Sequence, residues 1–208
     1  MMKAVFCALG LLTAAQAVAV PSEHANLAVR HDDNKKASSP FTFTSTFNVI
    51  AKPENVVDAQ NNFTGGLQGS SGTFNFGINS NDNVICYNIT ITGFRGDYQS
   101  PAKSATHIHE AAVGKSGPPR YEPSPATPLL VRFIAFPNPV GSGEGPRRSI
   151  GCLTGPFVTG VNASNKDTGD GFHVRQIEQN PAMFFADVHS SLAVPGAIRG
   201  QLGEKNYC

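Results

Sequence analysis

The sequence lacks tryptophan, has few charged residues and carries almost no excess charge of either sign. Across its 208 residues, Lys and Arg total 16 and Asp and Glu total 15, a formal net charge of +1. Nucleic acids and acidic membrane surfaces attract proteins mainly through clustered basic side chains. The composition therefore predicts a protein that does not bind nucleic acid.

Long apolar runs are also missing after the first residues of the chain. Met1–Lys3 is a short basic start, Ala4–Ala15 is apolar, and Ala17–Ala19 offers small residues at a cleavage position. This pattern is typical of a secretory signal peptide, so we expect residues 1–19 to be removed and the protein to be extracellular. No later run approaches the roughly 20 apolar residues that a membrane span needs. The C-terminus likewise lacks the hydrophobic tail of a lipid-anchor signal.

Cysteine is scarce, with four in the chain, and Cys7 lies within the expected signal peptide. The three that follow predict one disulfide and one leftover thiol in an oxidising compartment. We favour a bond between Cys86 and Cys152, because Cys208 is the last residue and chain ends tend to fray. A bond that fastens Cys208 stays open as the alternative.

Three Asn-X-Ser/Thr sequons fit secretion and predict N-glycosylation at Asn62, Asn88 and Asn162.

Alternation of apolar and polar residues dominates the chain from residue 40 onward. Residues 20–39 are polar and without period, so we expect a flexible leader followed by one domain at 40–205. Phe41 to Val49, Phe74 to Ile78 and Ile85 to Ile91 each show the two-residue period of a half-buried strand. Further strands are expected within 106–109, 129–136, 157–161, 184–189 and 197–202, and a short helical turn within 174–179. The prediction is an all-β fold, an antiparallel β-sandwich or Greek-key barrel.

Histidine is the residue type most suggestive of chemistry. His107 and His109 share one side of an expected strand, opposite Ile108, and His189 has the same parity relative to Val188. If the two strands are neighbours, three imidazoles face one spot and can bind copper or zinc. The alternative is that the rings hydrogen-bond loop backbone. No set of residues in the sequence matches a known catalytic pattern. His173 is expected to be structural or solvated.

Two blocks of sequence resemble the CHRD domain, which is named from chordin. They are Thr106–Pro119 (THIHEAAVGKSGPP) and Asn180–Leu202, which contains Val188–His189 and Ile198–Leu202. Ile85–Gly93, Gly151–Phe157 and Lys166–Gly169 resemble the secreted fungal members. Ala111 and Asp187 stand where the family often has Gly and Asn. The resemblance implies a non-enzymatic extracellular binding or cell-surface module, whose partner is an extracellular protein or a cell-wall ligand.

A more distant resemblance is to the copper/zinc superoxide dismutases. It implies copper ligands at His107, His109 and His189 and an anion-guiding role for Arg199. Glu110 and Asp187 are expected to orient the rings. Pro119 follows Gly117-Pro118 where the dismutases have a histidine that bridges both metals, so the resemblance implies no zinc site. The second functional hypothesis is therefore a copper protein with a superoxide-dismutase-like fold and three histidine ligands. Its activity would be superoxide handling, as in a copper-only dismutase, or copper carriage.

Overall fold

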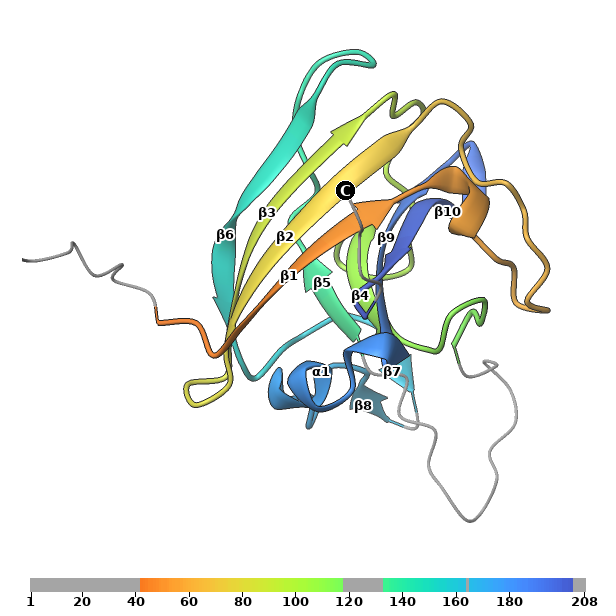
Figure 1. The fold of residues 1–208 in the computed structure, drawn as a ribbon. Coiled ribbons are helices and arrows are strands. Elements are labelled where there is room, and N and C mark those ends of the chain that lie inside the picture. Colours follow the sequence, from red (N-terminus) through yellow and green to blue (C-terminus); the bar gives the residue numbers. More distant parts are fainter. Residues whose placement is uncertain (1–41, 118–132, 164, 204–208) are drawn as a thin grey trace, which may run out of the picture. The chain divides into compact units, whose positions relative to one another are not determined.

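Two four-stranded antiparallel sheets form the framework of the described part of the chain (Figure 1). The computed structural model describes residues 42–117, 133–163 and 165–203. Sheet A has the order β1-β2-β3-β6, and sheet B has the order β10-β9-β4-β5. The strands are β1 (Ser45–Ala51), β2 (Ser71–Asn79), β3 (Val84–Thr92), β4 (Thr106–Glu110), β5 (Phe133–Phe136), β6 (Arg147–Thr154), β9 (Phe184–Ser190) and β10 (Ala193–Gln201).

Smaller elements connect these strands. They are the 3-10 turns η1 (Pro53–Asn55) and η2 (Pro181–Met183), the hairpin of β7 (Asn162–Ala163) and β8 (Lys166–Asp167), and the helix α1 (Arg175–Gln179). The last agrees with the helical turn expected from the sequence. Among the described residues, no helix is long and apolar enough to cross a membrane.

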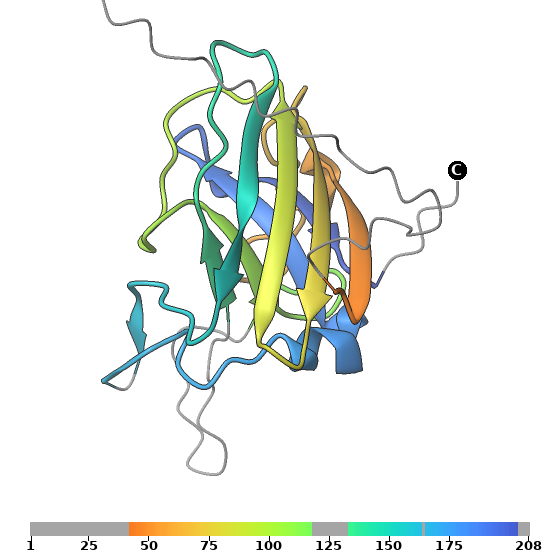
Figure 2. The same ribbon diagram turned by 90° about the vertical axis from the view of Figure 1, so that its left-hand side faces the viewer.

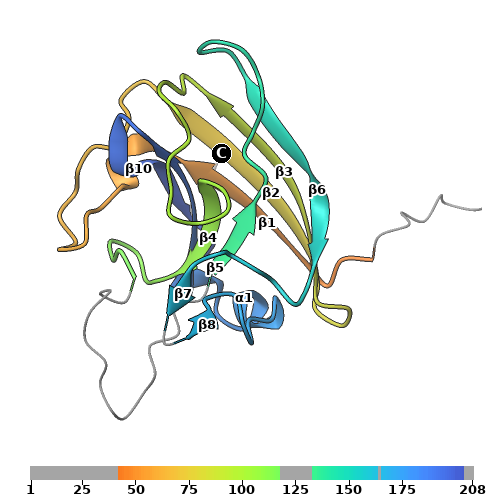
Figure 3. The same ribbon diagram turned by 180° about the vertical axis from the view of Figure 1, so that it is seen from behind.

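The core lies between the two sheets, as the alternating pattern predicts. Sheet A contributes Phe74 and Ile78 from β2 and Ile85 and Ile89 from β3, all fully buried. Sheet B contributes residues of β4, β5, β9 and β10, namely Ile108, Ile134, Phe136, Val188 and Ile198. Figure 2 shows the strands of sheet A side by side, and Figure 3 shows the molecule from behind. The two sheets stay separate, so the expected sandwich is confirmed and the closed barrel is not.

Phe43 differs from its predicted place among the inward-facing residues. The phenylalanine precedes β1 and is 40% exposed. A Cβ atom added at Gly77 would meet its ring at 2.6 Å. Since Gly77 faces away from the core between the buried Phe76 and Ile78, the ring packs on the outer side of sheet A.

The strand expected at 157–161 is absent, because side-chain hydrogen bonds replace strand pairing there. The N–H groups of Thr159 and Gly160 donate to the Asp167 carboxylate at 2.9 and 2.8 Å. Phe157 is buried but packs against Phe172 rather than extending a sheet.

Strand β6 was not expected, because its apolar pattern is inverted. Ile150 points outward and is 68% exposed, and Gly151 occupies an inward position. A Cβ at Gly151 would lie 2.7 Å from the Tyr87 hydroxyl, so the aromatic ring of β3 fills the space that a larger β6 side chain would take.

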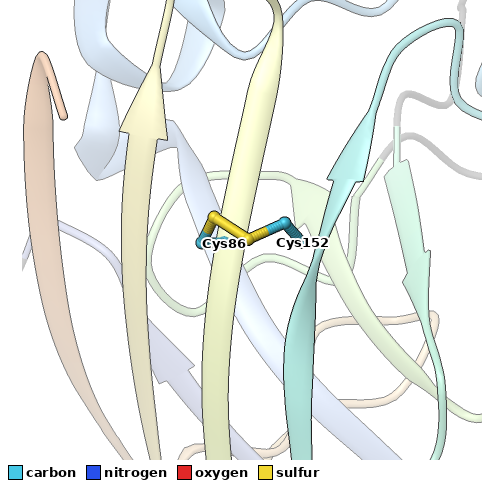
Figure 4. The surroundings of a disulfide bond; sticks show 2 residues. All are labelled: Cys86 and Cys152. Atoms are coloured by element: carbon cyan, nitrogen blue, oxygen red, sulfur yellow. A yellow bond between two sulfur atoms is a disulfide. The ribbon is translucent and has the colours of Figure 1, made fainter. Parts of the chain in front are cut away.

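Cys86 and Cys152 form a disulfide between β3 and β6, which confirms the favoured pairing (Figure 4). The two residues are direct cross-strand partners, with Cα atoms 3.9 Å apart. Both lie on the outer face of sheet A, where Cys152 is exposed and Cys86 is half-buried. Cys208, the expected signal peptide and leader, and most of the expected loop at 114–128 lie outside the described residues.

Candidate metal centre

The three histidines singled out in the sequence lie on adjacent strands of sheet B. Strands β4 and β9 are labelled in Figure 1. In their antiparallel register, His107 is opposite Asp187 and His109 is opposite Phe185. His189 follows on β9, and its N–H donates to the Ala105 carbonyl at 2.8 Å. Because Ile108 and Val188 fill the core, their neighbours must point to the outer face of the sheet.

Four side chains on this face converge. One potential ligand atom from each of His107, His109, Asp187 and His189 lies within 4.8 Å of the other three. Asp187 is central: its Oδ1 is 3.5 Å from Nδ1 of His107. Its Oδ2 is 3.5 Å from Nε2 of His109 and 3.1 Å from Nε2 of His189. We call these four residues the His-Asp cluster.

Backbone carbonyls orient two of the rings. Nε2 of His107 lies 2.6 Å from the Ser104 carbonyl, and Nδ1 of His189 lies 3.3 Å from the Val194 carbonyl. A carbonyl oxygen only accepts, so these nitrogens carry the proton and donate. In a neutral ring, the opposite nitrogen then points its lone pair at Asp187. This is the arrangement by which outer hydrogen bonds fix the tautomer of metal-ligating histidines.

Burial favours the neutral form of His107. The side chain of His107 is 2% exposed. Its burial lowers the pKa of the ring, although the neighbouring Asp187 opposes that shift. Burial alone would raise the pKa of Asp187, but positive charge on His109 and His189, when these rings are protonated, lowers that pKa well below its usual range. The carboxylate is thus negative, and it lies opposite imidazole lone pairs whenever the rings are neutral.

The donor set fits a divalent transition-metal ion. Such ions bind imidazole nitrogen and carboxylate oxygen at about 2.0–2.2 Å, which places opposite donors roughly 4 Å apart. Modest side-chain rotation closes a group spanning 4.8 Å to that size. A cation among these atoms would also remove the repulsion between the carboxylate and the imidazole lone pairs.

Loop segments cover most of the His-Asp cluster. Ser100 and Ser104 contact the ring of His107, and Arg199 and Gln201 of β10 donate to the carbonyls of Ala112 and Ala111. The side chains of His109 and His189 keep exposures of 21% and 18%. The site therefore has limited access to solvent through these two rings.

Asp187, Arg199 and Glu110 were also expected around the site, and the structure places each of them differently relative to the donor atoms. Asp187, expected only to orient a ring, supplies an atom of the donor group itself. Arg199 is the cross-strand partner of Asp187, but it is 4% exposed and its guanidinium lies 3.6 Å from the centre of the Phe185 ring. That placement does not support the expected role of guiding anions from solvent. Glu110 ends β4 outside the donor group.

Sequence reasoning missed the ring supports. Phe185 stacks on His109 with ring centres 5.1 Å apart, and the carbonyls of Ser104 and Val194 hold the other two rings. Carbonyl groups are present in every residue, so no sequence pattern distinguishes these two. His173, expected to be structural, accepts a hydrogen bond at Nδ1 from the Arg175 N–H.

No second metal site accompanies the cluster within the part of the chain that the structure describes. There it is the only group of three or more His, Cys, Asp or Glu side chains arranged to share an ion.

Comparison with known proteins identifies the family. The family model of the CHRD domain matches residues 47–202, from within β1 to just past the end of β10. No curated protein and no solved structure matches the chain. The matched region contains both sheets and all four members of the His-Asp cluster. The chain therefore belongs to the CHRD domain family.

Proposed function

We propose that this CHRD protein is secreted and binds one copper ion at the His-Asp cluster. The observation that carries the proposal is the meeting of three imidazoles and one carboxylate within 4.8 Å on two paired strands. Among divalent first-row ions, copper binds nitrogen-rich sites most tightly, ahead of zinc. Secretion rests on the signal-peptide pattern of residues 1–19 and places the site in an oxidising environment.

Each residue has a defined part in this proposal. His107 and His189 present Nδ1 and Nε2, held by the carbonyls of Ser104 and Val194, and His109 presents Nε2 from its place on Phe185. Asp187 contributes the negative charge that a cation needs in a mostly buried site. Bound copper would supply a centre capable of one-electron exchange.

Asp187 also bears on the type of copper protein. A redox enzyme that acts on superoxide needs an open position beside its metal for the substrate. Here Asp187 offers a fourth donor, and Arg199 is buried under the 111–112 segment. These two features favour copper holding or carriage over superoxide turnover.

Copper titration of the purified protein tests this proposal. The wild type should bind one ion with nitrogen hyperfine structure in its electron paramagnetic resonance spectrum. His109→Ala should weaken binding by about 10-fold or more, because it removes one nitrogen donor. His173→Ala is the matched control, since His173 lies outside the cluster, and it should bind like the wild type. Competition with zinc should leave copper bound.

Equal copper affinity in the wild type and His109→Ala would overturn the proposal. The His-Asp cluster would then serve only to stabilise the fold through hydrogen bonds. In that case the family resemblance would favour the other role, a binding or cell-surface module for an extracellular protein or a cell-wall ligand.

A further inference from the structure

The outer face of sheet A carries a sequon at its centre. Outward-facing positions on the strands are mostly hydroxyl or amide residues, and Asn48, Thr73, Asn75 and Asn88 are exposed. Asn88 is on β3, an inner strand of the sheet. It points away from the core because its neighbour Ile89 is buried in the core and successive strand residues face opposite sides. Figure 2 shows this sheet with β3 between β2 and β6.

Asn88 lies beside an exposed apolar side chain and beside the disulfide on the outer face of sheet A. Its cross-strand partners are Asn75 on β2 and Ile150 on β6, and directly opposed side chains lie roughly 5 Å apart at Cβ. Ile150 is 68% exposed, unusual for a large apolar side chain on an open sheet. Figure 4 shows the disulfide that joins Cys86 to Cys152. Cys86 precedes Asn88 by two residues on the same face of β3, so this disulfide is a near neighbour of Asn88.

We infer that Asn88 carries an N-linked glycan whose first sugars lie over Ile150 and the Cys86–Cys152 disulfide and shield that disulfide from protein thiols. The inference rests on the proposed secretion, but not on copper. In the modification, Nδ2 of Asn88 bonds to the anomeric carbon of an oligosaccharide carried on a lipid pyrophosphate. The bond from that carbon to the pyrophosphate breaks, and the amide loses one proton.

Steric access is the physical basis of the shielding. Reduction of a disulfide requires a thiolate to approach one sulfur in line with the bond, so its rate depends on access to that sulfur. Cys152 is exposed on edge strand β6, where a reductant meets the bond first. A sugar chain fixed to Asn88, two residues from Cys86 on the same outer face, would extend over the disulfide and hinder the approach of a protein thiol.

The Asn62 sequon is not placed to do this. Asn62 lies in a loop whose Thr64 and Leu67 bond to Val56 and to Ala197 of β10, on the sheet B side. Its side-chain amide donates to Asp58 at 3.3 Å. Asn62 therefore provides a control glycan remote from the disulfide.

The test uses secreted full-length protein and three variants. Thr90→Val removes the sequon hydroxyl while keeping a β-branched residue in the strand, and Thr90→Ser keeps the sequon. Asn62→Gln removes the control glycan. Glycopeptide masses report occupancy, and alkylation of the Cys86 and Cys152 peptides reports the rate of reduction by thioredoxin and by dithiothreitol.

In Thr90→Val, thioredoxin should reduce the Cys86–Cys152 disulfide about threefold faster than in the wild type, or more. The rate with dithiothreitol should change less, because this smaller reagent can pass the sugars. Thr90→Ser and Asn62→Gln should match the wild type. Enzymatic removal of the glycan from folded wild type should reproduce the Thr90→Val rate, which separates shielding from loss of folding. An unmodified Asn88, or equal thioredoxin rates with and without its glycan, would overturn the inference. Unprocessed protein that retains Met1 and carries no glycan would show instead that the proposed secretion had failed.

Discussion

Asp187 lies within 3.5 Å of a ring nitrogen of each of the three cluster histidines. A buried carboxylate in that position is stable only with nearby positive charge or strong donors. Protons on the rings can supply the charge, and so can a metal ion. The chemistry of the site therefore depends on whether Asp187 meets a cation or a set of N–H groups.

Replacing Asp187 with Asn separates these two situations. The amide keeps the shape of the side chain but removes the charge, so copper affinity should fall by about 10–100-fold. Isothermal titration calorimetry measures the change. Glu110→Gln removes a nearby carboxylate that lies outside the donor group and should bind copper like the wild type. Unchanged affinity in Asp187→Asn would show that the carboxylate is not a ligand.

At the scale of elements, the segment after β6 shows how one side chain replaces a strand. The carboxylate of Asp167 on β8 accepts hydrogen bonds from the N–H groups of Thr159, Gly160 and Gly169 and from the Thr159 hydroxyl, at 2.8–3.0 Å. Burial raises the pKa of Asp167, but these donors lower it more, so the pKa lies below its ordinary value. The charged form is thus the one that holds the loop.

Asp167→Ala should destabilise the domain by about 2–3 kcal/mol at neutral pH, because hydrogen bonds to a charged acceptor are lost. As pH falls, the Asp167 carboxylate is protonated in the unfolded chain before it is protonated in the folded protein, because its pKa is lower in the folded protein. The stabilisation from Asp167 is therefore present above its ordinary pKa of 3.8 and lost as pH falls through the lower folded value. Denaturant unfolding at several pH values should show the wild type and variant converging only in strong acid.

Asp170→Ala is the matched control for the Asp167 measurement. Asp170 lies on the same turn, but its pairing with Lys166 at 3.8 Å is between exposed side chains. Exposed pairs contribute little, so this variant should stay within about 0.5 kcal/mol of the wild type. A pH-independent difference for Asp167→Ala would mean that the carboxylate charge has no part in holding the loop.

At the scale of the whole molecule, the disulfide links strands far apart in sequence. Cys86 and Cys152 are separated by 66 residues, and the loop they close contains β4 and β5 of the opposite sheet. In the unfolded chain, the bond therefore restricts segments that will form both sheets. In the folded protein, it lies on the outer face of sheet A only.

Replacing both cysteines with serine should lower the free energy of unfolding by about 4 kcal/mol on the chain-entropy estimate for a loop of this length. Urea unfolding measures the loss, with Cys208→Ser as the control that leaves the pair intact. Non-reducing peptide mapping that finds Cys208 bonded to Cys86 or Cys152 would contradict the pairing.

Secretion predicts a processed and glycosylated product. The mature chain should begin near Val20 and migrate above its sequence mass until glycosidase treatment, because Asn62, Asn88 and Asn162 lie in sequons. Mass spectrometry of secreted protein from a eukaryotic host measures both features. An intact Met1 together with three unmodified asparagines would argue against an extracellular protein.

The sequence by itself determined the strands whose side chains obey a regular alternation. Val84–Thr92 alternates apolar and polar residues, and Thr106–Glu110 and Phe184–Ser190 place Ile108 and Val188 on the face opposite the histidines. That period alone predicts strands and the outward direction of Asn88, His107 and His189. The CHRD resemblance was also readable from these segments.

Tertiary structure decided the features that depend on pairing between distant strands. Strand β6 exists because Tyr87 fills the space above Gly151, an interaction with no local signal. Asp187 joins the histidines because the register of β4 and β9 places it opposite His107, and a one-residue slip would have turned it to the other face. The carbonyls of Ser104 and Val194 orient the rings only because the loop before β4 and the start of β10 lie beside them. Periodicity states which way a side chain points, but only the register and the packing of the sheets determine what it meets there.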